Sequence, residues 1–364
     1  MNRPDPIPVS VLTGFLGSGK TTLLNRLLKD PDLRDTAVII NEFGDVGIDH
    51  LLVEQSSDGV IELSDGCLCC TVRGELVDTL ADLVDRLHTG RIKALGRVIV
   101  ETTGLADPAP VLHAIMGHPV LVQNYRLDGV ITAVDAVNGD ATLNAHEEAV
   151  KQVAVADRIV LTKTDLIDPA SPEFARFTSR LMHLNPGAPQ LSSNDDEAKA
   201  VALFDCGLYD PATKTADVSR WLRDEAYRHD HDHVHDVNRH DARIRAFTLT
   251  EDKPIEPDAL EMFVDLLRSS QSDKLLRMKG IVGLADDPDR PVVLHGVQSI
   301  FHPPVRLAGW PDDDRRTRLV VITRDLEEAF VARLFAAFTG TPQIDTPDLQ
   351  AMESNPLSIP GFKP

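Results

Sequence analysis

The feature that most constrains this chain is a glycine-rich segment near its N-terminus, Gly14-Phe15-Leu16-Gly17-Ser18-Gly19-Lys20-Thr21. The apolar residues before the segment are typical of a buried strand, and the residues from Thr22 onward have a helical pattern. A glycine-rich turn at a helix N-terminus directs backbone N–H groups and the positive end of the helix dipole to one point. The segment therefore predicts a phosphate-binding loop between a strand and a helix.

Two side chains at the end of this loop have predicted roles. Lys20 is placed to reach the β- and γ-phosphates of a nucleotide, and the Thr21 hydroxyl is placed to bind Mg²⁺. We expect the nucleotide to contact Gly14, Gly17, Ser18, Gly19, Lys20, Thr21 and Thr22.

The charge balance limits the classes of partner. The chain has 364 residues, with 37 basic and 57 acidic side chains and a net charge of −20, which argues against nucleic acid or an anionic membrane. No apolar stretch reaches membrane-spanning length and the N-terminus has no signal-peptide core, so we expect a cytoplasmic protein.

Three of the four cysteines lie within four residues. In a reducing compartment this clustering favours metal or redox chemistry over a disulfide framework.

The chain divides into two predicted units. Short β-branched runs alternate with helical patterns through residues 1–210, which predicts an α/β unit with a mostly parallel sheet and helices on both faces. Residues 211–242 form a polar, histidine-rich linker, residues 243–340 a smaller α+β unit, and residues 341–364 a proline-rich tail. Strands are expected at 9–12, 37–40, 97–100, 130–134, 158–161, 244–250, 291–297 and 318–323. Helices are expected at 20–29, 73–87, 109–116, 145–154, 174–184, 257–268 and 326–338.

Further motifs follow the predicted strands, where ligands gather in parallel sheets. In Thr162-Lys163-Thr164-Asp165, the Asp165 carboxylate is suited to the paired N–H donors of guanine, and the Lys163 stem to packing along the base. Thr162 stands where guanine-binding proteins usually have asparagine.

In the segment from Glu101 to Gly104, we expect Glu101 to act on Mg²⁺ and Gly104 to let the backbone approach a γ-phosphate.

A second cluster of candidate ligands is Cys67-Leu68-Cys69-Cys70. Thiolates suit Zn²⁺ and related ions, and a fourth ligand would come from Asp45, a histidine or water. Asp45 belongs to the acidic loop 41–45, which we expect to order around Mg²⁺ and nucleotide. Inert buried cysteines and a redox disulfide are the alternatives for the cysteine cluster.

Residues 229–240 contain alternating histidines, which indicate either a weak metal-exchanging tract or a solvated linker.

With these motifs assembled, the chain resembles the CobW-like family of P-loop GTPases, which includes zinc metallochaperones, cobalamin-biosynthesis factors and nitrile hydratase activators. The resemblance extends to residues 127–135, 276–280 and 297–298. It implies slow GTP hydrolysis coupled to delivery of a divalent transition metal, Zn²⁺ or Co²⁺, to a client metalloprotein. Ile40 stands where relatives often have an acidic residue.

This resemblance assigns roles to particular residues. Lys20 and Glu101 are the candidate catalytic residues. GTP would also contact Gly104, Thr162, Lys163 and Asp165, and the metal ligands would be Thr21, Asp45, Cys67, Cys69 and Cys70. A P-loop ATPase or kinase, a GTP-dependent scaffold that activates a partner metalloenzyme, and a metal-storage protein are the alternatives.

Overall fold

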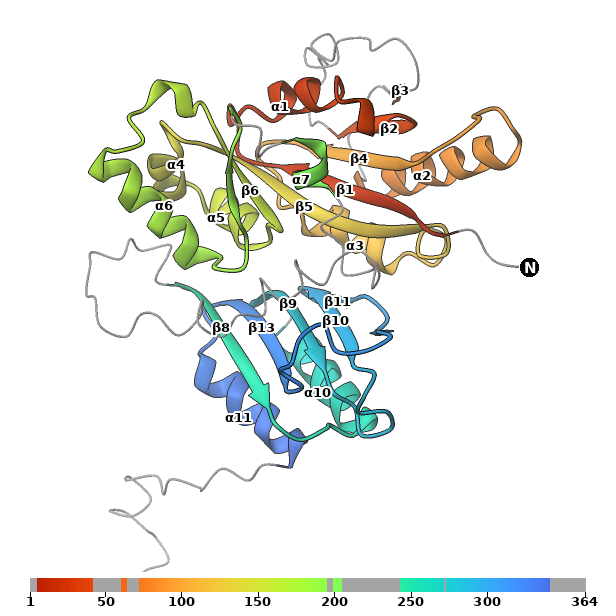
Figure 1. Ribbon diagram of the computed structural model, residues 1–364, viewed down its shortest axis with the longest axis vertical. Helices are drawn as coiled ribbons and strands as arrows, with labels where there is room; N and C mark the ends of the chain where they lie inside the picture. The colour runs from red at the N-terminus through yellow and green to blue at the C-terminus, as the bar shows by residue number, and fades with distance from the viewer. Residues whose placement is uncertain are drawn as a thin grey trace, which may run out of the picture.

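The computed structural model describes residues 5–41, 60–63, 72–194, 199–204, 243–271 and 273–340. These residues form an N-terminal unit, residues 5–204, and a C-terminal unit, residues 243–340 (Figure 1). Within the described ranges, no helix has both the length and the apolar character needed to cross a bilayer.

The N-terminal unit is built on a seven-stranded parallel sheet with the order β3-β2-β4-β1-β5-β6-β7. Its central strands are almost completely buried because helices cover both faces, as continuous apolar runs predict. The carboxyl ends of these strands share one edge of the sheet, on the left in Figure 1. The strands are β1 (Ile7–Thr13), β2 (Thr36–Asn41), β3 (Val60–Leu63), β4 (Arg97–Thr102), β5 (Tyr125–Asp135), β6 (Arg158–Thr162) and β7 (Gln190–Ser192).

Helices α1 and α7 pack on one face of this sheet, through leucines such as Leu24 and Leu203. Helices α2, α3, α5 and α6 contribute to the cores on the other face. The helices are α1 (Lys20–Leu27), α2 (Val72–His88), α3 (Ala109–Gly117), α4 (Gly139–Ala145), α5 (Glu147–Ala154), α6 (Pro172–Leu184) and α7 (Ala200–Leu203). Short 3₁₀ turns lie at Pro31–Leu33 and Thr164–Leu166.

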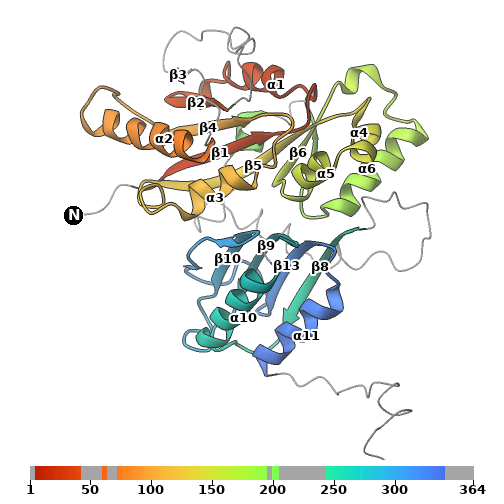
Figure 2. The same ribbon diagram turned by 180° about the vertical axis from the view of Figure 1, so that it is seen from behind.

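The C-terminal unit is an antiparallel sheet in the order β11-β10-β9-β13-β8, with β12 paired to β10. Helices α10 and α11 cover one face through a phenylalanine-rich core, and Figure 2 shows both helices in front of their sheet. The elements are β8 (Ile244–Glu251), α10 (Pro257–Ser270), β9 (Leu275–Val282), β10 (Val292–Val297), β11 (Ile300–Phe301), β12 (Val305–Arg306), β13 (Thr317–Arg324) and α11 (Glu328–Thr339).

The other face of the C-terminal sheet packs on α3, α5 and α6 of the N-terminal unit, so sheets and helices alternate through the whole molecule (Figures 1 and 2). Charged groups are buried in this contact. Asp157, directly before β6, accepts hydrogen bonds from Arg277 and Lys279 of β9, and from the backbone N–H of Val130 at 2.9 Å. His295 of β10 is buried beside Arg277.

These observations confirm the predicted fold class, an α/β unit with a parallel sheet and a smaller α+β unit. Every predicted strand and helix is present, with three kinds of difference. The sequence predicts no strand at β3, β7, β9, β11 or β12. It also predicts no separate helix at α4 or α7. The predicted helix at 145–154 corresponds to α5, which begins at Glu147; Ala145 is the last residue of α4, and the backbone of His146 between them is extended, with φ of −134° and ψ of 116°.

Candidate functional site: a nucleotide-binding edge

The glycine-rich segment connects β1 to α1 as a tight loop. Gly14, Gly17 and Gly19 have φ of 142°, 73° and 86°, a region that L side chains rarely adopt. At Gly14 there is also no space, because a Cβ atom would lie 2.3 Å from the carbonyl oxygen of Ala133. The loop therefore requires glycine for its backbone path and for its close contact with β5.

Helix α1 begins with the two side chains for which phosphate and Mg²⁺ roles are predicted. The Lys20 ammonium is buried and donates to the carbonyl oxygens of Gly14 at 2.9 Å and Phe15 at 3.4 Å, so it lies within the turn of the loop. The Thr21 hydroxyl donates to Glu101 Oε1 at 3.0 Å. Thr22 follows in the same helical turn.

Thr21 lies in the first turn of α1 and Glu101 near the end of β4, and their side-chain oxygen atoms lie together. Glu101 is the penultimate residue of β4, which pairs directly with β1, and it is 2% exposed. A hydroxyl and a carboxylate oxygen are ligands that Mg²⁺ prefers, and this pair lies beside Lys20 at the helix N-terminus. The donor set therefore fits a magnesium ion bound next to a nucleotide phosphate.

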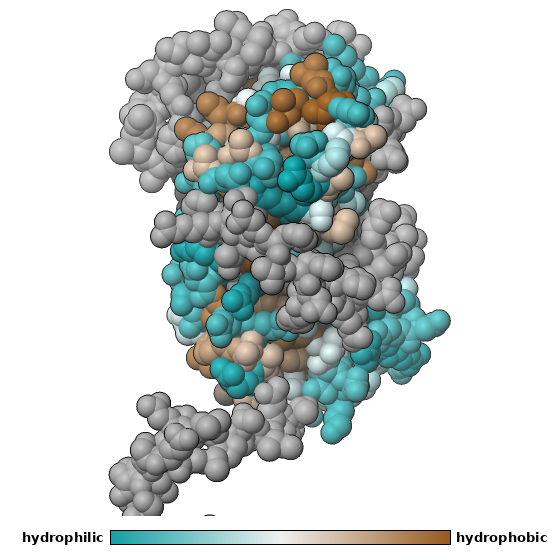
Figure 3. All heavy atoms as spheres, turned by 90° about the vertical axis from the view of Figure 1, so that its left-hand side faces the viewer, coloured by the Kyte–Doolittle hydropathy of each residue, from teal (hydrophilic) through white to brown (hydrophobic). Residues whose placement is uncertain are grey.

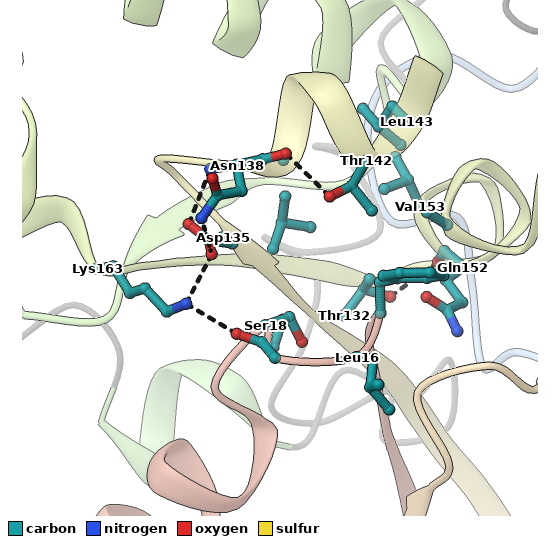
Figure 4. A pocket seen from close by; sticks show the side chains of 16 residues that line it. Leu16, Ser18, Thr132, Asp135, Asn138, Thr142, Leu143, Gln152, Val153 and Lys163 are labelled. Carbon is teal, nitrogen blue, oxygen red and sulfur yellow. Dashed lines mark hydrogen bonds and ion pairs between the residues drawn. The ribbon is translucent and has the colours of Figure 1, made fainter. Parts of the chain in front are cut away.

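The segment after β6 is tied to the glycine-rich loop. Lys163, with a left-handed φ of 57°, donates from Nζ to the Gly17 carbonyl at 2.9 Å and to Asp135 Oδ2 at 2.7 Å (Figure 4). Burial alone would raise the pKa of Asp135. Hydrogen bonds from Lys163, Asn138 and two backbone N–H groups instead hold that pKa below its ordinary value. Asp135 is thus a permanent anchor for Lys163 at neutral pH.

Thr162 supports the loop through its hydroxyl, which donates to the Ser18 carbonyl at 2.6 Å. This contact gives a physical reason for threonine in place of the usual asparagine. Asp165, the expected guanine-binding carboxylate, is exposed, and its Oδ1 accepts a hydrogen bond from Asn194 Nδ2 at 3.0 Å. Asn194 also donates to Thr164, at 3.0 Å. The sequence carries no signal for Asn194, because this residue follows β7, a three-residue strand without a motif.

The segment after β4 lies against the glycine-rich loop. A Cβ atom on Gly104 would be 2.6 Å from the backbone nitrogen of Leu16, so this position admits only glycine without a backbone shift. A cavity of about 300 Å³ opens on the neighbouring side of the loop, between the loop, the end of β5 and helices α4 and α5 (Figure 4). Gln152, Thr142 and Lys163 are among its lining residues.

The loops at this edge also expose large apolar side chains. Leu16, Leu105, Val137 and Leu166 are between 46% and 67% exposed, and they follow β1, β4, β5 and β6 respectively. Figure 3 views the molecule from the side on which these strands end, and both hydrophobic and hydrophilic side chains reach that surface. The edge thus offers apolar as well as polar contacts to a bound molecule.

The predicted transition-metal ligands Asp45, Cys67, Cys69 and Cys70 lie outside the described residues, as do the loop 42–45 and the histidines of 229–240. Within the described part of the chain, no group of three or more His, Cys, Asp or Glu side chains is arranged to hold a metal ion. The residues that flank the cysteine segment 64–71 in the sequence lie within the described ranges. Leu63 ends β3 at the same sheet edge as Glu101, and Val72 begins α2.

Both units match known protein families. A family model for the CobW/HypB/UreG nucleotide-binding domain matches residues 8–192, and a model for the C-terminal domain of the cobalamin synthesis protein cobW matches residues 244–339. The zinc chaperone YjiA of Escherichia coli (strain K12) is 33% identical over 332 residues, covering 91% of this chain and 98% of that protein.

Two further matches cover similar lengths. The zinc chaperone CobW of Sinorhizobium sp is 30% identical over 368 residues, covering 91% of this chain and 97% of that protein. The crystal structure of Zn(II)-bound YjiA GTPase from E. coli superposes with a TM-score of 0.68 at 31% identity, covering 92% of this chain and 99% of the other.

Proposed function

Since the chain belongs to the CobW/HypB/UreG family of nucleotide-binding proteins, we propose that it is a cytoplasmic GTPase that carries Zn²⁺. In this proposal the chain releases the ion to a client metalloprotein under the control of GTP hydrolysis. The names of the full-length relatives, zinc chaperones and a GTPase, support this choice of nucleotide and cargo over an ATPase or kinase. Zn²⁺ is preferred to Co²⁺ on the same ground.

One contact supports the nucleotide assignment most strongly: the hydrogen bond from Lys163 Nζ to the Gly17 carbonyl, at 2.9 Å. It brings the segment that precedes Asp165 against the glycine-rich loop, although the two are 146 residues apart. The guanine-recognition residues Lys163 and Asp165 and the phosphate-binding loop then belong to one site, which is the geometry a single GTP molecule requires.

Within this site, each residue has a physical task. Lys20 exchanges its carbonyl partners for β- and γ-phosphate oxygens, and backbone N–H groups of Gly17, Ser18 and Gly19 surround the phosphates. Thr21 and Glu101 hold Mg²⁺. When bound, Mg²⁺ supplies positive charge that offsets the negative charge of the phosphate oxygens.

The same assignment covers the base. Asp165 accepts the paired N–H groups of guanine, while Lys163 packs along the ring and Thr162 keeps the loop in place through Ser18. Gly104 approaches the terminal phosphate.

The cargo site is assigned to the thiolates of Cys67, Cys69 and Cys70, with Asp45 as the fourth ligand. Leu63, the last described residue before the cysteine motif, ends β3 at the same edge of the sheet as Glu101. In this proposal, a change around the terminal phosphate is transmitted along this edge to the cargo site. GTP and Zn²⁺ affinities are then coupled, and the coupling is reciprocal.

The proposal predicts that Zn²⁺ binds with different affinity when the protein holds a non-hydrolysable GTP analogue and when it holds GDP. Competition titrations with a zinc indicator measure both affinities, and a tenfold difference corresponds to about 1.4 kcal/mol of coupling. Cys69→Ser should lose the tight site, because one thiolate is removed, whereas the matched control Cys206→Ser, outside the motif, should keep it.

Nucleotide selectivity and turnover complete the test. GTP should displace a fluorescent guanine nucleotide where ATP does not, and Lys20→Ala should abolish hydrolysis. Equal Zn²⁺ affinity in the GTP-analogue and GDP states contradicts the coupling, and equal displacement by ATP contradicts the guanine assignment. Transfer of Zn²⁺ to an apo-metalloenzyme in the absence of any nucleotide, at the rate seen with GTP, contradicts control by hydrolysis.

A further inference from the structure

Helix α5 directs the polar side chain of Gln152, which is 1% exposed, toward the nucleotide edge. Its Nε2 donates to the carbonyl oxygen of Ala106 at 3.0 Å and to that of Gly104 at 3.3 Å. Both acceptors belong to the segment after β4 that lies against the glycine-rich loop. The Gln152 backbone carbonyl accepts a hydrogen bond from the Thr132 hydroxyl on β5 at 2.8 Å, which fixes the residue to the sheet.

The orientation of this amide is determined by its partners. Two carbonyl oxygens are acceptors only, so the nitrogen of the amide must face them. Gln152 Oε1 is buried with no hydrogen-bond partner among the described residues, and the side chain lines the cavity beside the loop. Gln152 therefore acts on the Gly104 segment as a donor of two hydrogen bonds.

The backbone held by Gln152 is in close contact with the glycine-rich loop. The Gly104 Cα lies so near Leu16 that a methyl group does not fit between them, as the 2.6 Å distance from a Cβ atom to Leu16 N indicates. A displacement of the Gly104 carbonyl therefore moves the Gly104 peptide relative to the phosphate-binding loop.

Helix α5 is itself fixed at several points. His146, before its first residue, stacks on Phe15 of the glycine-rich loop with ring centroids 4.3 Å apart. Lys151 bridges Glu147 at 3.6 Å and Asp107 at 3.4 Å. Glu147 in turn forms an ion pair with Arg324 of the C-terminal unit. Gln152 thus projects from a helix that contacts the loop, the Gly104 segment and the C-terminal unit.

We infer that Gln152 is a positioning residue for GTP hydrolysis: by donating to the carbonyls of Gly104 and Ala106, it keeps the Gly104 peptide in place against the phosphate-binding loop during cleavage of the terminal phosphate. This inference rests on the proposed function, because it assumes that GTP is hydrolysed at this edge.

The test compares Gln152→Met, which keeps the length and removes the donor, with Gln152→Glu, which keeps the shape. In steady-state GTP hydrolysis with Mg²⁺, the kcat of Gln152→Met should be reduced by about 10- to 100-fold. A displacement of the Gly104 peptide by about 1 Å is enough to slow catalysis to this extent. KM for GTP should stay within about threefold, because the phosphate and base contacts remain. Gln190→Met is the matched control, since Gln190 Nε2 also donates to a backbone carbonyl, that of Thr178, at 2.9 Å.

Gln152→Glu adds a readout that loss of stability would not produce. An ionised Glu repels two carbonyl oxygens, whereas its protonated form donates one hydrogen bond. The ratio of its kcat to that of the wild type should therefore rise as pH falls from about 8 to about 5.5, where a buried carboxyl gains its proton. The same ratio for Gln152→Met should stay constant with pH.

The outcomes separate this inference from the proposed function. If the wild type hydrolyses GTP and Gln152→Met matches it within about twofold, or if the Gln152→Glu ratio does not change with pH, the positioning role is wrong and the proposed function stands. If the wild type itself does not hydrolyse GTP, both are wrong. If Gln152→Met unfolds below the assay temperature, the pH profile of Gln152→Glu decides the matter.

Discussion

Removing the buried charge of Asp157 should loosen the contact between the two units. Its carboxylate, 5% exposed, accepts from Arg277 Nη2 at 2.7 Å and from Lys279, and also from the Val130 N–H at 2.9 Å. Asp157→Asn keeps the shape and can keep the Val130 bond, but it withdraws the negative charge from two buried cations. Breaking such a buried pair costs about 3–5 kcal/mol.

That magnitude is large enough to measure by thermal unfolding. At about 2 °C per kcal/mol for a chain of this size, the melting temperature of Asp157→Asn should fall by roughly 6–10 °C. The matched control is Asp289→Asn, because the Asp289–Arg315 pair has the same chemistry with side chains 82% and 69% exposed. The control should change stability by less than about 1 kcal/mol.

A triple variant tests whether apolar side chains can replace the whole ion cluster. Replacing the cluster as a whole, with Asp157→Leu, Arg277→Met and Lys279→Met together, should recover much of the loss, since apolar groups of similar volume can replace a buried ion cluster. If Asp157→Asn melts within about 2 °C of the wild type, as the exposed control should, then burial does not determine the strength of this contact.

Two further outcomes follow from the buried histidine and from the glycine after β4. Burial, and then the cations of Lys279 and Arg277, lower the pKa of His295 well below its ordinary value, so the folded protein keeps this imidazole neutral while the unfolded chain protonates it below about pH 6.5. Stability is therefore full above about pH 6.5 and falls as pH decreases, by up to about 1.4 kcal/mol per pH unit. The melting temperature of the wild type should drop more between pH 7.5 and pH 5.5 than that of His295→Gln, and equal drops would disprove the assignment. Gly104→Ala should lower GTP turnover by at least about tenfold, because its methyl group must displace the backbone of Leu16. Gly309→Ala, where a Cβ atom meets nothing within 4 Å, serves as the control, and turnover of Gly104→Ala equal to that of this control would contradict the steric argument.

The parts of the fold that could be predicted are those that local sequence determines. The loop from Gly14 and the segments at Glu101 and Thr162 each follow an apolar β-branched run, and parallel strands place all such ends at one edge. Strands β3 and β7 have four and three residues, too few to show alternation. The sequence does not predict strand β9, because Arg277 and Lys279 interrupt its apolar residues. Both side chains pair with Asp157, which is more than 100 residues away in the sequence.

Contacts between distant side chains account for most of what the sequence did not reveal at the site. The pattern at 145–154 predicts a helix that begins at Ala145, whereas α4 ends there and α5 begins at Glu147. The ring of His146, which lies between the two helices, stacks on Phe15. Gln152 looks like one polar residue on an amphipathic helix, and its bonds to Gly104 and Ala106 join residues 48 and 46 positions apart. No local propensity encodes such pairings, because they depend on the packing of α5 against the sheet.

The order of the strands gives a bound nucleotide a direction. In the proposed binding mode, with the base after β6 and the phosphates after β1, the polyphosphate would extend along the strand order toward β4, β2 and β3. Three inter-strand steps of about 4.8 Å place β3 roughly 14 Å from β1. GTP and GDP share the end that faces β6 and differ at the end that faces β3. In this mode, the chemical difference between substrate and product arises on the side of the sheet where β3, the strand that precedes the cysteine motif in the sequence, ends.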